Sequence, residues 1–96
     1  MNSNLEGTQY NIAIPEVLKA VKEEQIKKDL TFVYEALCEK GYNPISQLIG
    51  YILTEAPPYI TSHNGARKLA CRLDRYEILE VLLKQMLQGK SDDVHD

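Results

Sequence analysis

The chain has 96 residues, of which 44% are hydrophobic, and it carries a formal net charge of −3. This length fits a single domain, and the hydrophobic share is that of a folded chain. Because no run of about 18 apolar residues occurs, we expect no membrane-spanning helix. The negative net charge argues against general nucleic-acid binding. The N-terminus lacks the basic and apolar regions of a secretory signal, so we expect a cytoplasmic protein whose cysteines, Cys38 and Cys71, stay reduced.

Residues 1–14 are mostly polar and show no sustained hydrophobic period, so we predict a flexible N-terminal arm. Thr8 lies in this arm beside Gly7, where an accessible hydroxyl would suit a protein kinase. Phosphate there would add about 1.5 to 2 negative charges, which could dock the arm on arginines or repel an acidic partner. An idle threonine in a flexible arm is the plainer interpretation.

Residues 15–88 are predicted to form an all-helical domain, a bundle of four to five helices that begins at Pro15. An apolar stripe at helical spacing runs along residues 15–40, with a polar interruption at residues 22–25. The stripe consists of Val17, Leu18 and Val21, then Leu30, Val33, Tyr34 and Leu37. The pattern leaves open whether this region forms one helix or two.

Residues 40–44 combine a helix end, a turn and a helix start. Gly41 can adopt the left-handed conformation that ends a helix, Asn43 can cap the next one, and Pro44 suits its first turn. The predicted second helix, about residues 44–53, carries an apolar stripe. That stripe consists of Ile45, Leu48, Ile49, Ile52 and Leu53.

Pro57 and Pro58 must interrupt the helical pattern, and we expect Tyr59 and Ile60 to anchor the following loop on the core. A short third helix is then predicted, with Thr61, Ser62 and Asn64 as candidate caps. Its apolar stripe consists of Ala66, Leu69, Ala70 and Leu73.

The last helix is predicted to start at Asp74, with Glu77 three residues later as in a capping box. Seven of the ten residues from 78 to 87 are apolar, which exceeds what one buried face needs. We therefore expect this helix to pack on two sides, one of them a second subunit. Residues 89–96 are predicted to be a disordered acidic tail.

The sequence contains no recognisable catalytic, metal-ligating or phosphate-binding constellation, so we expect neither enzymatic activity nor a cofactor. His63 is interpreted as a cap or loop-packing residue, with partner contact as the alternative. Lys68, Arg72 and Arg75 have the spacing of one helix face, and Arg67 lies nearby. These basic residues form either a solvated face or a cluster that binds an acidic or phosphorylated partner.

Several blocks of the sequence resemble the IreB-like regulatory phosphoprotein family, which includes ReoM, of low-GC Gram-positive bacteria. The resemblance covers residues 30–87, which are 58 of the 96 residues. It rests on the runs Val33–Leu37, Glu39–Ile45 and Gln47–Leu53, and continues through Pro57, Tyr59-Ile60, His63, Ala66-Arg67 and Leu73–Arg75. Glu55-Ala56 stands where the family typically has Gly-Asp.

The resemblance implies a small, all-helical homodimer without catalytic activity, phosphorylated on an N-terminal threonine by a membrane-bound Ser/Thr kinase with PASTA domains. Thr8 occupies the comparable place. The resemblance also implies control of peptidoglycan synthesis and antibiotic tolerance through protein contacts, including Clp-type regulated proteolysis. On this hypothesis Arg67, Arg72, Arg75 and His63 contribute to a partner-binding surface. The alternative is a small helical nucleic-acid-binding module that places Lys68, Arg72 and Arg75 on phosphates.

Overall fold

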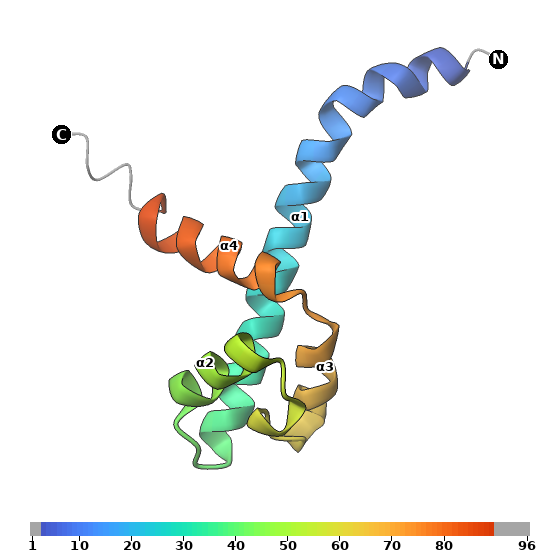
Figure 1. Ribbon diagram of the computed structural model, residues 1–96. Coiled ribbons are helices and arrows are strands. Elements are labelled where there is room, and N and C mark those ends of the chain that lie inside the picture. The colour runs from blue at the N-terminus through green and yellow to red at the C-terminus, as the bar shows by residue number, and fades with distance from the viewer. Residues whose placement is uncertain (1–2, 90–96) are drawn as a thin grey trace.

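The computed structural model describes the backbone of residues 3–89 and the side chains of residues 15–89, and these residues form an all-helical fold. Its elements are α1 (Ser3–Glu39), α2 (Pro44–Thr54), the 3₁₀ turns η1 (Pro57–Tyr59) and η2 (His63–Gly65), α3 (Ala66–Arg72) and α4 (Arg75–Leu87). Figure 1 shows α2 and α3 beside the C-terminal half of α1, while α4 crosses the middle of α1. The predicted all-α class is confirmed, and the predicted acidic tail lies, beyond Gly89, outside the described residues.

The long helix α1 answers the question that the sequence pattern left open. It is continuous from Ser3 to Glu39, so residues 15–40 do not break at the polar stretch 22–25. Those polar residues stay helical because they face solvent or pair with α4. The helix also includes residues 3–14, where we expected an arm, and it passes through Pro15. A proline removes one backbone hydrogen bond and kinks a helix without having to end it, and Figure 1 shows α1 bending towards its N-terminal end.

The turn between α1 and α2 has the predicted geometry. Gly41 has φ +81°, a left-handed conformation, and the neighbouring Tyr42 N–H donates to the Leu37 carbonyl at 3.0 Å. The Asn43 side chain accepts a hydrogen bond from the Ser46 N–H at 3.1 Å, and Pro44 opens the helix. These contacts turn the chain sharply and bring α2 back against α1.

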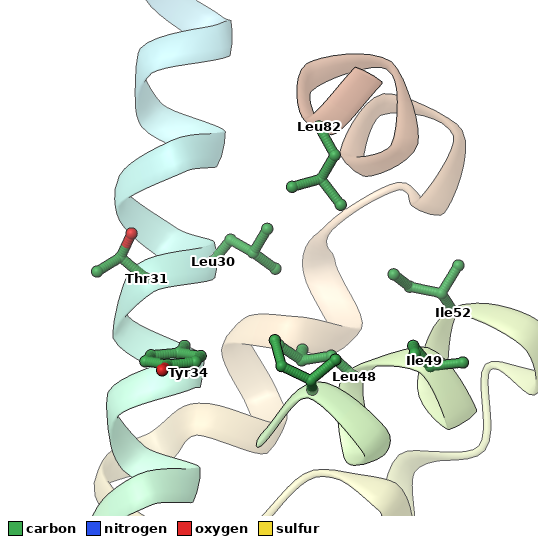
Figure 2. Close-up of a pocket in the computed structure, with 8 residues that line it drawn as sticks. Leu30, Thr31, Tyr34, Leu48, Ile49, Ile52 and Leu82 are labelled. Carbon is green, nitrogen blue, oxygen red and sulfur yellow. The ribbon is translucent and has the colours of Figure 1, made fainter. Parts of the chain in front are cut away.

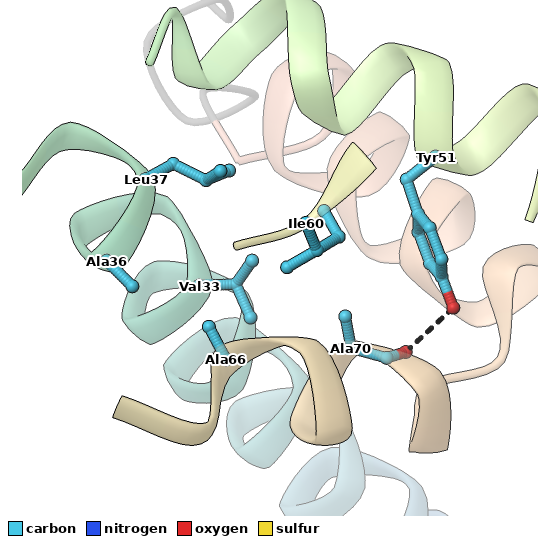
Figure 3. Close-up of a cluster of buried hydrophobic side chains, with 7 residues drawn as sticks. All are labelled: Val33, Ala36, Leu37, Tyr51, Ile60, Ala66 and Ala70. Carbon is cyan, nitrogen blue, oxygen red and sulfur yellow. Dashed lines mark hydrogen bonds between the residues drawn. The ribbon is translucent and has the colours of Figure 1, made fainter. Parts of the chain in front are cut away.

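The larger of two hydrophobic clusters joins α1, α2, α3 and the loop after η1 (Figure 3). Its buried members are Val33, Ala36, Leu37, Tyr51, Ile60, Ala66 and Ala70. The predicted anchoring of the loop by Ile60 is confirmed, since this side chain is fully buried. The Tyr51 hydroxyl donates to the Ala70 carbonyl at 3.3 Å, which satisfies its one polar atom inside the core.

The smaller cluster joins α4 to the middle of α1. Ile26, Ile78 and Val81 are buried there. Leu30, Ile52 and Leu73 pack against them at the edge. The Asp74 side chain caps α4 by accepting from the Glu77 N–H at 3.1 Å, as predicted. The Glu77 carboxylate does not complete a capping box, because it is paired with Lys22 of α1 at 2.8 Å.

Two details of the sequence predictions are wrong, one about the packing of α2 and one about the cap of α3. Helix α2 buries Tyr51, which lies outside the predicted stripe, whereas Ile45, Ile49 and Leu53 are more than half exposed. The reason is that η1 packs against α2 at Gly50, through the ring of Tyr59, and that Tyr51 points into the cluster shared with α1 and α3. Helix α3 follows Gly65 directly from η2 and has no side-chain cap. None of the candidate caps Thr61, Ser62 and Asn64 therefore caps this helix.

Candidate partner-binding surfaces

The candidate phosphorylation site, Thr8, lies on the helical N-terminal part of α1 rather than in an irregular segment. Its side chain lies outside the described side chains, which begin at residue 15. Figure 1 shows this end of α1 projecting away from the other helices. The position therefore stays a prediction, on a segment that stands apart from the folded core.

Arg67 is partly buried and supports the loop after η1. Its Nε donates a hydrogen bond to the Ile60 carbonyl at 2.8 Å. Ile60 is fully buried, so this bond holds in place the residue that anchors the loop on the core. The guanidinium is thus positioned by the fold, with a structural role beside any contact with a partner.

Arg75 connects the start of α4 with the end of α2. Its Nη1 donates to the Ile52 carbonyl at 3.0 Å, and its Nε lies 3.4 Å from the Glu55 carboxylate. The last carbonyls of a helix have no partner within that helix and carry partial negative charge, which a guanidinium complements. Arg75 therefore fixes the junction of the two helices.

His63 joins η2 to the C-terminal end of α1. Its Nε2 lies 2.8 Å from Oε1 of Glu39 and 3.2 Å from Nδ2 of Asn64. The interpretation as a loop-packing residue fits this position. The ring is only partly covered, so one side of it also belongs to the surface near α3.

The predicted basic face of Lys68, Arg72 and Arg75 is wrong as a single helix face. Helix α3 ends at Arg72, Leu73 is extended, and Arg75 opens α4. The i, i+4 and i+3 spacing therefore does not continue across the break. Lys68 and Arg72 remain together on α3, both exposed, and within the described residues neither side chain makes a hydrogen bond or ion pair.

An apolar groove of about 460 Å³ opens between α1, α2 and α4. Figure 2 shows Leu30 and Tyr34 of α1 facing Leu48 and Ile49 of α2, with Leu82 of α4 at the far end. Thr31, Ile45 and Ile52 complete the lining. Apart from Thr31, these residues belong to the apolar sets of the predicted helices, but the sequence pattern did not indicate that they would face an open groove.

Helix α4 extends this apolar surface beyond the groove. It buries only Ile78 and Val81, while a row of large side chains stays exposed. The row consists of Tyr76, Leu79, Leu82, Leu83, Met86 and Leu87. This matches the predicted excess of apolar residues over one buried face, and it leaves a contiguous surface of the kind that marks protein contacts.

Charged residues flank the contact of α4 with α1. The Lys84 ammonium lies 2.7 Å from the Glu23 carboxylate, and this hydrogen bond lowers the pKa of Glu23 and raises the pKa of Lys84. The pKa of Lys22 is raised by its hydrogen bond and charge interaction with Glu77. Lys19 and Glu80 form a looser pair at 3.7 Å. These pairs connect the two helices across the smaller cluster.

Elsewhere the described side chains offer little for chemistry. Within residues 15–89, no three His, Cys, Asp or Glu side chains gather as a metal site would require. Cys38 and Cys71 are both free and exposed. No described helix has the length and apolar character needed to cross a membrane. The arrangement is therefore one of surfaces: an apolar groove, an apolar helix face and a small basic patch.

A comparison with protein families relates this chain to a known family. The model of the IreB regulatory phosphoprotein family matches residues 13–88, which include all of α2, α3 and α4 and most of α1. The matched region contains Arg67, Arg72, Arg75 and His63. Thr8 lies N-terminal to it.

Proposed function

The chain belongs to the IreB regulatory phosphoprotein family, and we propose that it acts without catalysis as a cytoplasmic regulator controlled by Ser/Thr kinase phosphorylation. The family match over residues 13–88 carries this proposal. The exposed apolar surfaces of α2 and α4 support it, because a protein that works by contact needs surface that its own fold does not use.

The modification site in this proposal is Thr8. A phosphate on the projecting end of α1 would place about two negative charges away from the core, where they alter recognition without disturbing packing. The kinase is expected to be of the PASTA-domain type, and the regulated process to be peptidoglycan synthesis and antibiotic tolerance. Clp-type regulated proteolysis is the proposed route, and a homodimer the proposed form.

Among the candidate contact residues, Arg72 is the one that the fold leaves most available. Arg67, Arg75 and His63 are held by Ile60, by the end of α2 and by Glu39. We propose that Arg72, beside Lys68, contacts an acidic group of the partner directly. The other three residues shape the surface around this contact. Exposed arginine is well suited to bidentate binding of carboxylate or phosphate.

A recovery experiment tests both assignments. Purified chain, unmodified or phosphorylated at Thr8, is used as bait in native lysate, and the partners are compared by mass spectrometry. We expect the set of partners to differ between the two forms. We also expect weaker recovery with both Arg72→Ala and Arg72→Lys, because lysine cannot make the bidentate contact of arginine. Identical partner sets would remove the switch, and full recovery with Arg72→Ala would make Arg72 ordinary surface.

A further inference from the structure

Helix α4 is joined to the rest of the fold by a small apolar contact. The cluster beneath it has three buried members, Ile26, Ile78 and Val81, against seven in the cluster that holds α1, α2 and α3 together. The connection to α3 is Leu73 and Asp74, both extended. At its N-terminal end α4 is fixed by Arg75 to the Ile52 carbonyl. Within the described residues, the C-terminal end of α4 makes no comparable hydrogen bond to α2 or α3.

The remaining attachment of α4 is electrostatic. Lys22 meets Glu77 at 2.8 Å, Glu23 meets Lys84 at 2.7 Å, and Lys19 meets Glu80 at 3.7 Å. Both helices carry charges of both signs, so opposite charges meet in the observed placement of α4 on α1. If α4 shifted along α1, like charges would approach each other. The paired side chains are between 25% and 63% exposed, which leaves them open to screening by salt.

We propose that α4 is an electrostatic latch: the ion pairs hold it on α1, and screening or loss of a charge releases it while α1, α2 and α3 stay folded together. The helix would swing about Leu73-Asp74 with its N-terminal end held by Arg75. Release would uncover Ile26 on α1 and Val81 on α4, next to the apolar groove. The surface offered to other proteins would then depend on charge at this contact, a property beyond the proposed control through Thr8.

Amide hydrogen exchange of the full chain at about 20 mM and about 500 mM sodium chloride tests the latch, because exposed pairs are strongly screened across this range. An isolated helix as short as α4 is marginal in water, so its amides exchange once it is released. We expect exchange of residues 78–87 to rise about threefold or more in high salt, the range given by weakening of exposed ion pairs. Exchange of residues 33–37 and 66–70 should stay unchanged.

A pair of matched variants separates the latch from a general effect of charge. In low salt, Glu23→Gln should raise the exchange of α4 by part of the high-salt increase, because the Lys22–Glu77 and Lys19–Glu80 pairs remain. Glu24→Gln removes the same charge from the adjacent position, but Glu24 pairs with Lys27 inside α1, so α4 should stay protected. The reversed pair, Glu23→Lys with Lys84→Glu, should restore protection relative to either single reversal.

Three results would overturn the proposal. One is a rise in exchange that is equal in α4 and in residues 33–37, which would mean global unfolding. Another is the same response to Glu23→Gln and Glu24→Gln. The third is exchange of α4 that is the same in low and in high salt when the protein concentration is held constant.

Discussion

At the scale of single residues, three positions on or next to α2 show how local geometry constrains the sequence. Glu55 ends α2 with φ +59°, a left-handed conformation that side chains disfavour. Gly50 lies under the ring of Tyr59, with room for no side chain of its own. Tyr51 of α2 is buried, and its hydroxyl donates to the Ala70 carbonyl of α3. Each position leads to a measurable expectation.

Replacing Glu55 with glycine should relieve backbone strain. Glu55→Ala is the matched control, because it loses the same contact with Arg75 but keeps the strained Cβ. We expect Glu55→Gly to exceed Glu55→Ala in free energy of unfolding by about 1 kcal/mol, the usual cost of the left-handed conformation. Chemical denaturation of the two variants measures this difference, and equal stabilities would show that position 55 is unstrained.

Because Gly50 contacts Tyr59, the effect of Gly50→Ala on stability should change sign when the Tyr59 ring is removed. A Cβ at position 50 would lie within 2.7 Å of three atoms of the Tyr59 ring, so Gly50→Ala should destabilise the fold by about 1 to 3 kcal/mol. In a Tyr59→Ala background the clash is gone, and alanine should stabilise the helix by up to about 1 kcal/mol relative to glycine. Thermal unfolding of the four chains tests this, and an equal loss in both backgrounds would contradict it.

Burial, aided by the contact with Cys71, raises the pKa of Tyr51 to about 12. The neutral phenol is favoured in the fold, so its contribution to stability is present below the ordinary value of 10.0 and is lost as the pH rises through about 12. We expect an ultraviolet titration of the six tyrosines to show one late step, absent in Tyr51→Phe. A late step that persists in Tyr51→Phe would assign the shift to another tyrosine.

At the scale of elements, α4 differs from α2 and α3 in how it is attached. The shorter helices share a continuous apolar cluster with α1, whereas α4 combines a small cluster with ion pairs. Apolar contacts respond little to pH, but ion pairs lose their strength when one partner is neutralised. The attachment of α4 should therefore be the part of the fold that is most sensitive to acid.

Acidification should loosen α4 through Glu23. Lys84 lowers the pKa of Glu23, so the stabilisation from this pair is present above the ordinary value of 4.5 and is lost as the pH falls through the lowered pKa. We expect Glu23→Gln to reduce the loss of stability between about pH 5 and pH 3, measured by denaturant unfolding. In a Lys84→Gln background the same substitution should have little further effect, and an undiminished effect there would rule out the pair as its cause.

At the scale of the whole molecule, the chain is less compact than its length allows. Its radius of gyration is 17.4 Å, whereas a compact domain of this size has about 12.5 Å. The excess comes from the long α1 and from α4, which leave apolar side chains such as Leu83 and Met86 exposed. Burial of this surface against a second copy would supply the stabilisation that a small single core lacks.

The proposed homodimer gives a prediction at this scale. Leu83 is 56% exposed, so Leu83→Glu should leave the single chain folded but place a charge in an interface formed by α4. We expect the dissociation constant of the dimer to rise about tenfold or more, measured by sedimentation, because about 1.4 kcal/mol corresponds to tenfold. Gln85→Glu adds the same charge at an exposed polar position of α4 and should have a smaller effect; a monomeric parent chain would contradict the prediction.

The sequence by itself determined the helices from α2 to α4, the caps of α2 and α4, and the family. Gly41, Asn43 and Asp74 act within a few residues of where they stand, and apolar spacing identifies each helix from α2 to α4 because local sterics and hydrogen bonds decide these features. Only the tertiary structure decided which apolar face of α2 is covered, that Arg67 and Arg75 bind backbone carbonyls, and that α4 rests on α1 through ion pairs. The physical reason is distance along the chain: those contacts join residues from different helices, and a periodic pattern does not specify which face a neighbour will cover.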